Sequence, residues 1–94
     1  MHYAAAKAGI LGLTWPLAYE VTCDNIAVDA ICPGPLYTDM RLPPAWAARK
    51  QAGLLMGRQG HVSEIAPTAL LLATEVAAFY VGATFNPNCG DIVI

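Results

Sequence analysis

The chain has 94 residues, of which 56% are apolar and 13% charged, and its net charge is −2. Ordinary globular chains contain about 45–50% apolar and about 25% charged residues. A free-standing domain of this size would need more polar residues to cover its surface, so the excess predicts apolar faces that pack against something else. The basic residues are few and scattered, which argues against binding to nucleic acid.

No targeting or metal-binding segment is predicted. The uncharged stretch 8–19 is shorter than the roughly 20 apolar residues that a membrane helix needs, and Pro16 interrupts it. The start of the chain lacks the basic and apolar regions of a signal peptide. The three cysteines show no ligand spacing, so we expect reduced thiols, no metal site and a cytoplasmic location.

The first predicted element is a helix from residue 3 to about residue 22. Alanine is frequent there, and apolar side chains recur at helical spacing, namely Ile10, Leu13, Leu17 and Val21. A surface of small residues would permit close packing, and it consists of Ala8, Gly9 and Gly12. Pro16 predicts a kink or a break, because proline in a helix interior removes a hydrogen bond at a cost of about 3 kcal/mol.

A short run with β-branched residues, 26–31, predicts a buried strand. The strand is expected to end at the rigid turn 32–35, which contains two prolines and a glycine. Residues 44–55 then predict a short helix, since Pro44 suits a first helical turn.

The last two predicted elements are a second firm helix and a strand. Ser63 is the expected N-cap of a helix over residues 64–74, with Glu64 favourable at its positive end. Residues 83–87 predict the final strand. The order helix, strand, helix, helix, strand predicts an α/β fold in which helices cover a parallel sheet. Two strands alone would make a poor sheet, so the fold is expected to be incomplete on its own.

Tyr3 and Lys7 are the first residues that could carry chemistry. They are four residues apart on the predicted helix, so their Cβ atoms lie about 5–6 Å apart on one face. A free phenol is a poor acid–base catalyst at neutral pH, and a nearby ammonium favours its ionised form. Such a pair could exchange a proton with a carbonyl or alcohol oxygen. Taken alone, the spacing is common by chance and does not identify an enzyme.

Four segments give this pair a context. Residues 3–14 (YAAAKAGILGLT) closely resemble the catalytic helix of short-chain dehydrogenases/reductases. Residues 26–40 (IAVDAICPGPLYTDM) resemble the next strand and Pro-Gly cofactor loop of that family, 57–66 the segment before its last long helix, and 81–90 its last strand and Gly-rich end. The chain is thus similar to the C-terminal part of this family, and within it to the 3-oxoacyl reductases.

The resemblance implies an NAD(P)-dependent oxidoreductase that acts on an alcohol or ketone group. The position of Tyr3 is that of the acid–base catalyst. The position of Lys7 is that of the lysine that activates the tyrosine and holds the nicotinamide ribose. The cofactor could be NAD or NADP, because the matched part of the family does not contain the residue that distinguishes them.

The resemblance also implies four further cofactor contacts in the loop after the first strand. Pro33 and Gly34 match the turn beside the nicotinamide. Leu36 matches a residue whose backbone contacts the carboxamide, and Thr38 matches a hydroxyl near the carboxamide and the phosphates.

The family fold is a Rossmann-like doubly wound parallel sheet, so residues 1–94 are expected to form part of such a domain without its N-terminal dinucleotide-binding half. We therefore expect the isolated chain to have little or no activity. Two alternatives stay open. The chain could be a non-catalytic piece that forms a homo-oligomer, or pairs with a longer relative, through the helix 3–21. It could also be a truncated gene model in which Met1 is an internal methionine.

The chain departs from the family pattern at structural positions. Asp29 stands where the family usually has asparagine, and Ala27 where it often has arginine. Trp15-Pro16 replaces a pair of the Arg-Ala type. Cys89 replaces a glycine in a turn that would need a positive φ.

Overall fold

The structure is a computed structural model that describes residues 1–39 and 43–93. Its elements are α1 (His2–Val21), a 3-10 turn (Thr22–Asp24), β1 (Ala30–Ile31), α2 (Pro44–Ala52), α3 (Val62–Leu72), a second 3-10 turn (Glu75–Ala77) and β2 (Thr84–Phe85). The predicted order of helices and strands is therefore confirmed. Met40, the last residue of the second family-like segment, lies outside the described residues.

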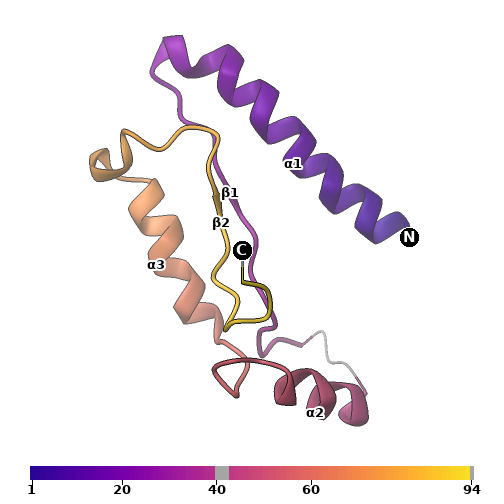
Figure 1. Cartoon of the computed structure of the whole chain (residues 1–94). Helices are drawn as coiled ribbons and strands as arrows, with labels where there is room; N and C mark the ends of the chain where they lie inside the picture. The colour runs from indigo at the N-terminus through magenta and orange to yellow at the C-terminus, as the bar shows by residue number, and fades with distance from the viewer. Residues whose placement is uncertain (40–42, 94) are drawn as a thin grey trace.

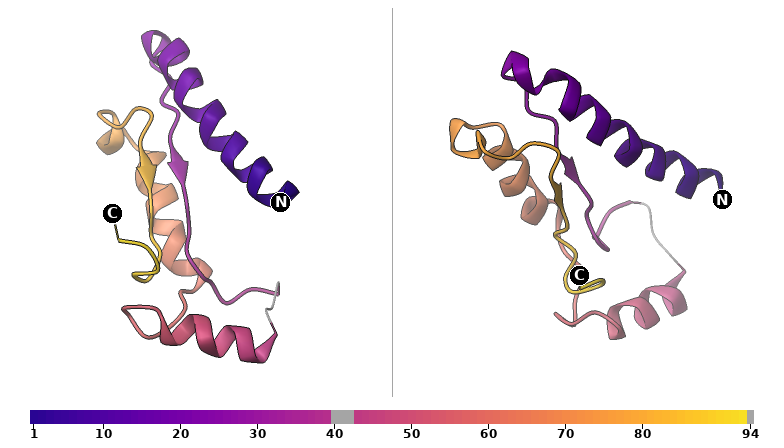
Figure 2. Two further views of the ribbon diagram at one scale, coloured as in Figure 1. Left: turned by 45° about the vertical axis from the view of Figure 1, so that its right-hand side comes forward. Right: turned by 45° about the horizontal axis from the view of Figure 1, so that its top comes forward.

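The two strands form a parallel pair between helices. Ala30 pairs with Thr84 and Ile31 with Phe85. Backbone hydrogen bonds continue the ladder beyond both ends of the strands, from Gly82 N to Val28 O (2.9 Å), Cys32 N to Phe85 O (2.8 Å) and Gly34 N to Pro87 O (3.1 Å). The helices α1 and α3 lie on either side of this pair, and α2 lies beyond the carboxyl ends of the strands (Figures 1 and 2).

Helix α1 runs through Pro16 without interruption, so the predicted break is wrong (Figure 1). Pro16 cannot donate to the carbonyl of Gly12, but both residues are exposed, and water can therefore satisfy that carbonyl. The cost of proline is lowest where the helix faces solvent, and this explains why the helix continues.

The third helix begins two residues earlier than predicted. The residue before α3 is His61, so the assignment of Ser63 as the N-cap is wrong. The carboxylate of Glu64 accepts a hydrogen bond from the backbone N–H of His61 at 2.8 Å, which satisfies a donor that the helix itself leaves free. Helix α2 ends at Ala52 instead of Leu55.

Asp29 has a structural role that explains why the chain tolerates it. Its carboxylate accepts a hydrogen bond from the backbone N–H of Ala83 at 2.8 Å, just before β2. An asparagine side chain offers an equivalent acceptor oxygen. Aspartate at this position therefore provides a contact that ties the start of β2 to β1.

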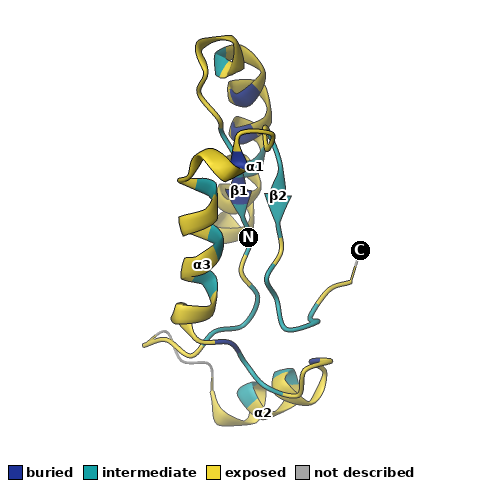
Figure 3. Ribbon diagram, turned by 90° about the vertical axis from the view of Figure 1, so that its left-hand side faces the viewer, coloured by how far each residue is buried: buried dark blue, intermediate teal, exposed yellow. Residues whose placement is uncertain are grey.

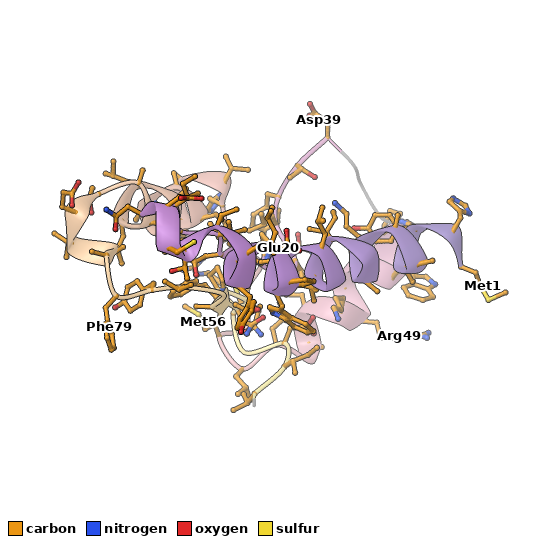
Figure 4. The ribbon with its side chains drawn as sticks, turned by 90° about the horizontal axis from the view of Figure 1, so that it is seen from above. Met1, Glu20, Asp39, Arg49, Met56 and Phe79 are labelled. Atoms are coloured by element: carbon orange, nitrogen blue, oxygen red, sulfur yellow. The ribbon has the colours of Figure 1, made fainter. Side chains whose placement is uncertain are left out.

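Very little of the described chain is buried. The buried apolar residues are Ala18, Ala30, Leu54 and Ala77, and no large side chain is fully buried among the described residues. All three helices are mostly exposed (Figure 3). Phe79, which is 97% exposed, projects away from the ribbon (Figure 4). The apolar excess of the composition therefore lies largely on the surface.

Candidate active site

A cleft of about 1080 Å³ opens at the carboxyl ends of the two strands. Its walls are Tyr3 from α1, residues 33–39 after β1, Ala47 and Lys50 of α2, Gln59, and Asp91 after β2. Ligands of open parallel sheets bind at this end of the strands. The cleft brings together Tyr3, Pro33, Gly34, Leu36 and Thr38, which are five of the six residues that the sequence predicted for the site.

Tyr3 and Lys7 lie together at the start of α1. The Nζ atom of Lys7 is 5.7 Å from the centre of the Tyr3 ring, which is within the range of a cation–π contact. Tyr3 is 64% exposed and lines the cleft. Lys7 itself does not line the cleft. It lies next to Tyr3, which does line it. A phenol and an ammonium placed this way can both donate hydrogen bonds to one bound molecule.

Gly34 marks the point where the loop after β1 presses against the loop after β2. A Cβ atom at Gly34 would lie 2.6 Å from Cα of Asn88 and 2.8 Å from its carbonyl oxygen. Only glycine allows this approach together with the hydrogen bond from Gly34 N to Pro87 O. The sequence identified Gly34 by family resemblance, and the structure adds a packing reason for it.

The segment 35–37 is held by its backbone. Leu36 forms a parallel bridge with Gly60. The N–H of Tyr37 donates to Gly60 O and the N–H of Gly60 donates to Pro35 O, both at 2.9 Å. Gly60, which is buried, was not identified by sequence reasoning, because nothing local to it signals a partner so distant along the chain.

Arg58 and Glu64 form an ion pair next to Gly60 that sequence reasoning also missed. The guanidinium donates two hydrogen bonds to the carboxylate, at 2.9 and 2.7 Å. These bonds, and the bond from the His61 backbone, lower the pKa of Glu64 from 4.5 to about 2. The same pairing raises the pKa of Arg58. The three-residue spacing of His61 and Glu64 is that of a capping box, which could have indicated the bond from the His61 backbone to Glu64. Histidine is not a typical N-cap residue, so the sequence did not suggest it.

A second ion pair joins α2 to the turn after β2. Lys50 Nζ lies 2.6 Å from Asp91 Oδ1, and both residues are walls of the cleft. The pair therefore connects the α2 side of the cleft to the strand side.

Residues 1–39 and 43–93 contain no group of three or more histidine, cysteine or acidic side chains that could hold a metal ion. None of the helices they form has both the length and the apolar character to cross a membrane.

Comparison with known proteins identifies relatives of the chain. A family model described as Enoyl-(Acyl carrier protein) reductase matches residues 1–90. The chain is 40% identical to acetoacetyl-CoA reductase of Rhizobium meliloti over 94 residues, covering 97% of this chain and 39% of that protein. It is 43% identical to 3-oxoacyl-[acyl-carrier-protein] reductase FabG of Pseudomonas aeruginosa over 91 residues, covering 95% of this chain and 37% of that protein.

A solved structure agrees with these matches. The crystal structure of 3-oxoacyl-[acyl-carrier protein] reductase from Brucella melitensis superposes with a TM-score of 0.89 at 35% identity. The match covers 95% of this chain and 34% of that one. The predicted fold class, part of a Rossmann-like parallel α/β sheet, is therefore confirmed. The chain belongs to the short-chain dehydrogenase/reductase family.

Proposed function

We propose that this chain forms the nicotinamide side of the cofactor site of an NAD(P)-dependent ketone reductase and supplies its acid–base group. The observation that carries the proposal is the cleft, which gathers Tyr3 and the loop 33–38 at the carboxyl ends of two parallel strands. Reductases named for 3-oxoacyl and acetoacetyl substrates are similar to almost the whole chain.

The cleft residues fit the nicotinamide end of such a cofactor. Ribose hydroxyls need charged or polar partners, and the Tyr3 hydroxyl and Lys7 ammonium, whose positions are linked by the 5.7 Å contact, provide them. A carboxamide needs both a donor and an acceptor, and the hydroxyl of Thr38 and the backbone around Leu36 can offer these in the same cleft. The proposal covers NAD and NADP equally.

In the proposed mechanism the bound cofactor supplies the hydride, and the chain supplies position and a proton. The Tyr3 hydroxyl donates a proton to the carbonyl oxygen during reduction and accepts it during oxidation. The Lys7 ammonium stabilises the phenolate that remains and donates hydrogen bonds to the ribose. Pro33 and Gly34 form the rigid turn that would hold the nicotinamide.

The proposal is tested by binding, with nicotinamide mononucleotide as the probe and adenosine monophosphate as the matched control ligand. We expect nicotinamide mononucleotide to shift the amide resonances of Tyr3, Gly34 and Thr38 in a saturable way, and adenosine monophosphate to leave them unchanged. Tyr3→Phe and Thr38→Val should weaken this binding. Tyr19→Phe is the control variant, because Tyr19 is an exposed tyrosine farther along α1. Equal shifts with both nucleotides, or none with either, would contradict the proposal.

Turnover of acetoacetyl-CoA with NADH and NADPH is measured on the same samples. The chain spans 39% of the length of the acetoacetyl-CoA reductase that it matches, so we expect little or no reduction by the chain alone. Tight cofactor binding together with carbonyl reduction would show that this expectation is wrong. It would also place the complete catalytic machinery within these residues.

A second candidate function is pairing with another subunit through α1. Of the 20 residues of this helix only Thr14 and Ala18 are buried. Large apolar side chains are exposed along it, including Ile10, Leu13 and Trp15. Sedimentation should show a dimer, or a complex with a longer relative, if α1 pairs. A folded monomer at working concentration in both experiments would argue against this function.

A further inference from the structure

Arg58 and Glu64 each bind a backbone group as well as each other. Arg58 Nη1 donates to the carbonyl oxygen of Gln59 at 3.1 Å, in addition to its bond with Glu64. Glu64 Oε2 accepts from the backbone N–H of His61 at 2.8 Å. The two bound groups, Gln59 C=O and His61 N–H, belong to the two peptide units on either side of Gly60.

Each peptide unit is planar, so fixing one end of it fixes the direction of the other. The carbonyl of Gln59 shares a plane with the N–H of Gly60, which donates to Pro35 O at 2.9 Å. The N–H of His61 shares a plane with the carbonyl of Gly60, which accepts from Tyr37 N at 2.9 Å. The ion pair therefore sets the orientation of both groups of Gly60 that hold the segment 35–37.

Gly60 lies close to Leu36 and Cys89, which belong to the loops after β1 and β2. A Cβ atom at this position would lie 2.9 Å from the Leu36 side chain and 3.4 Å from Sγ of Cys89. The segment 35–37 is also a wall of the cleft, whereas Arg58 and Glu64 are not. The pair can therefore act on a ligand in the cleft through the peptide units of Gly60, and through Gln59, which is itself a wall of the cleft and accepts a hydrogen bond from Arg58.

We infer that Arg58 and Glu64 are positioning residues, which hold the cofactor-facing segment 35–37 in place through the two peptide units of Gly60. The importance of Arg58 and Glu64 for cofactor binding rests on the proposed function. The structural part of the inference, the coupling from the ion pair to Pro35 and Tyr37, can be tested without a cofactor.

The first test measures amide hydrogen exchange of the ligand-free chain. In Arg58→Met and Glu64→Gln we expect exchange at the Gly60 and Tyr37 amides to accelerate about threefold or more, as for the loss of an exposed charged pair. The amide of Ala30, which lies in the β1–β2 ladder, should keep its rate. Lys50→Met is the matched control variant, because it breaks the other ion pair and should not change the Gly60 rate.

The second test exchanges the charges in the double variant Arg58→Glu with Glu64→Arg. This variant can still form an ion pair, but glutamate cannot donate to Gln59 O and arginine cannot accept from His61 N–H. We therefore expect exchange at Gly60 and Tyr37 to stay fast. Normal exchange in the swapped variant would show that the pair acts only as a charge pair and would overturn the inference, as would unchanged amides in the single variants.

Titration with nicotinamide mononucleotide separates this inference from the proposed function. If the unmodified chain binds the nucleotide and Arg58→Met weakens binding severalfold while Arg58→Lys weakens it less, both stand. If the nucleotide binds equally well to the unmodified chain and all variants, the positioning role is wrong while the proposed function stands. If the unmodified chain does not bind and only exchange responds, the proposed function fails and the backbone coupling stands.

Discussion

Gly34→Ala tests the packing of the turn beside the proposed nicotinamide site. The added Cβ would lie between 2.6 and 2.8 Å from three atoms of Asn88, two of which belong to the backbone and cannot rotate away. The loops after β1 and β2 would have to separate, and the 3.1 Å hydrogen bond from Gly34 to Pro87 would lengthen or break. Overpacking of this kind costs about 1–3 kcal/mol and the lost hydrogen bond about 1 kcal/mol. We therefore expect the free energy of unfolding to fall by about 2–4 kcal/mol.

Urea denaturation followed by circular dichroism measures this change. With a slope of about 1–3 kcal/mol per molar urea, the unfolding midpoint should fall by about 1 M or more. Gly12→Ala is the matched control, since a Cβ there meets nothing within 4 Å and lies on a helix. Alanine should stabilise that position by up to about 1 kcal/mol. Equal midpoints for Gly34→Ala and the unmodified chain would refute the packing argument.

Three further predictions concern turns and charges. Cys89 has a φ of 57°, so Cys89→Gly should stabilise the chain by about 1 kcal/mol. Gly57 has a φ of 69° and open space around it, so Gly57→Ala should destabilise the chain by about 1–2 kcal/mol. Unfolding midpoints that move in the opposite directions would contradict this. A double-mutant cycle with Lys50→Met and Asp91→Asn should give a coupling of about 0.2–1 kcal/mol that weakens in salt, because both side chains are partly exposed. The folded pKa of Glu64, about 2, lies below its ordinary 4.5, so the unfolded chain binds more protons between these values. The contribution of Glu64 is therefore complete above about pH 4.5 and lost as the pH falls towards 2; Glu64→Gln should flatten the acid limb of an unfolding titration, and an unchanged limb would refute the assignment.

The sequence predicted most of the elements because their signals are local. Alanine and the apolar spacing of residues 10–21 were sufficient for α1. The β-branched run 26–31 located β1, but the strand covers only Ala30–Ile31. The errors also came from local rules, because these rules ignore the surroundings of a residue. Pro16 was expected to kink or break α1, but the helix is not broken there, because the exposed position lets water bind the free carbonyl. Ser63 was expected to cap α3, but the carboxylate of Glu64 binds the preceding backbone instead.

The sequence also predicted residues of the candidate site, through motifs that lie within single segments. Tyr3 and Lys7 share a helix face by spacing alone, and Pro33 to Thr38 form one continuous loop. The family followed from the order of four such segments. The positive φ expected at Cys89 is confirmed at 57°.

The tertiary structure alone decided how these segments meet. The register that pairs Ala30 with Thr84 places the loops after β1 and β2 at one end of the strands. There the backbone of Asn88 leaves no space for a side chain at Gly34. Gly60 has a place in the site because its N–H and C=O bind Pro35 and Tyr37, which are distant along the chain. Local sequence determines which residues form a helix or a strand, since those hydrogen bonds close within a few residues. A peptide group that is not bonded within its own helix or strand needs another partner, and that partner depends on the packing of the whole chain.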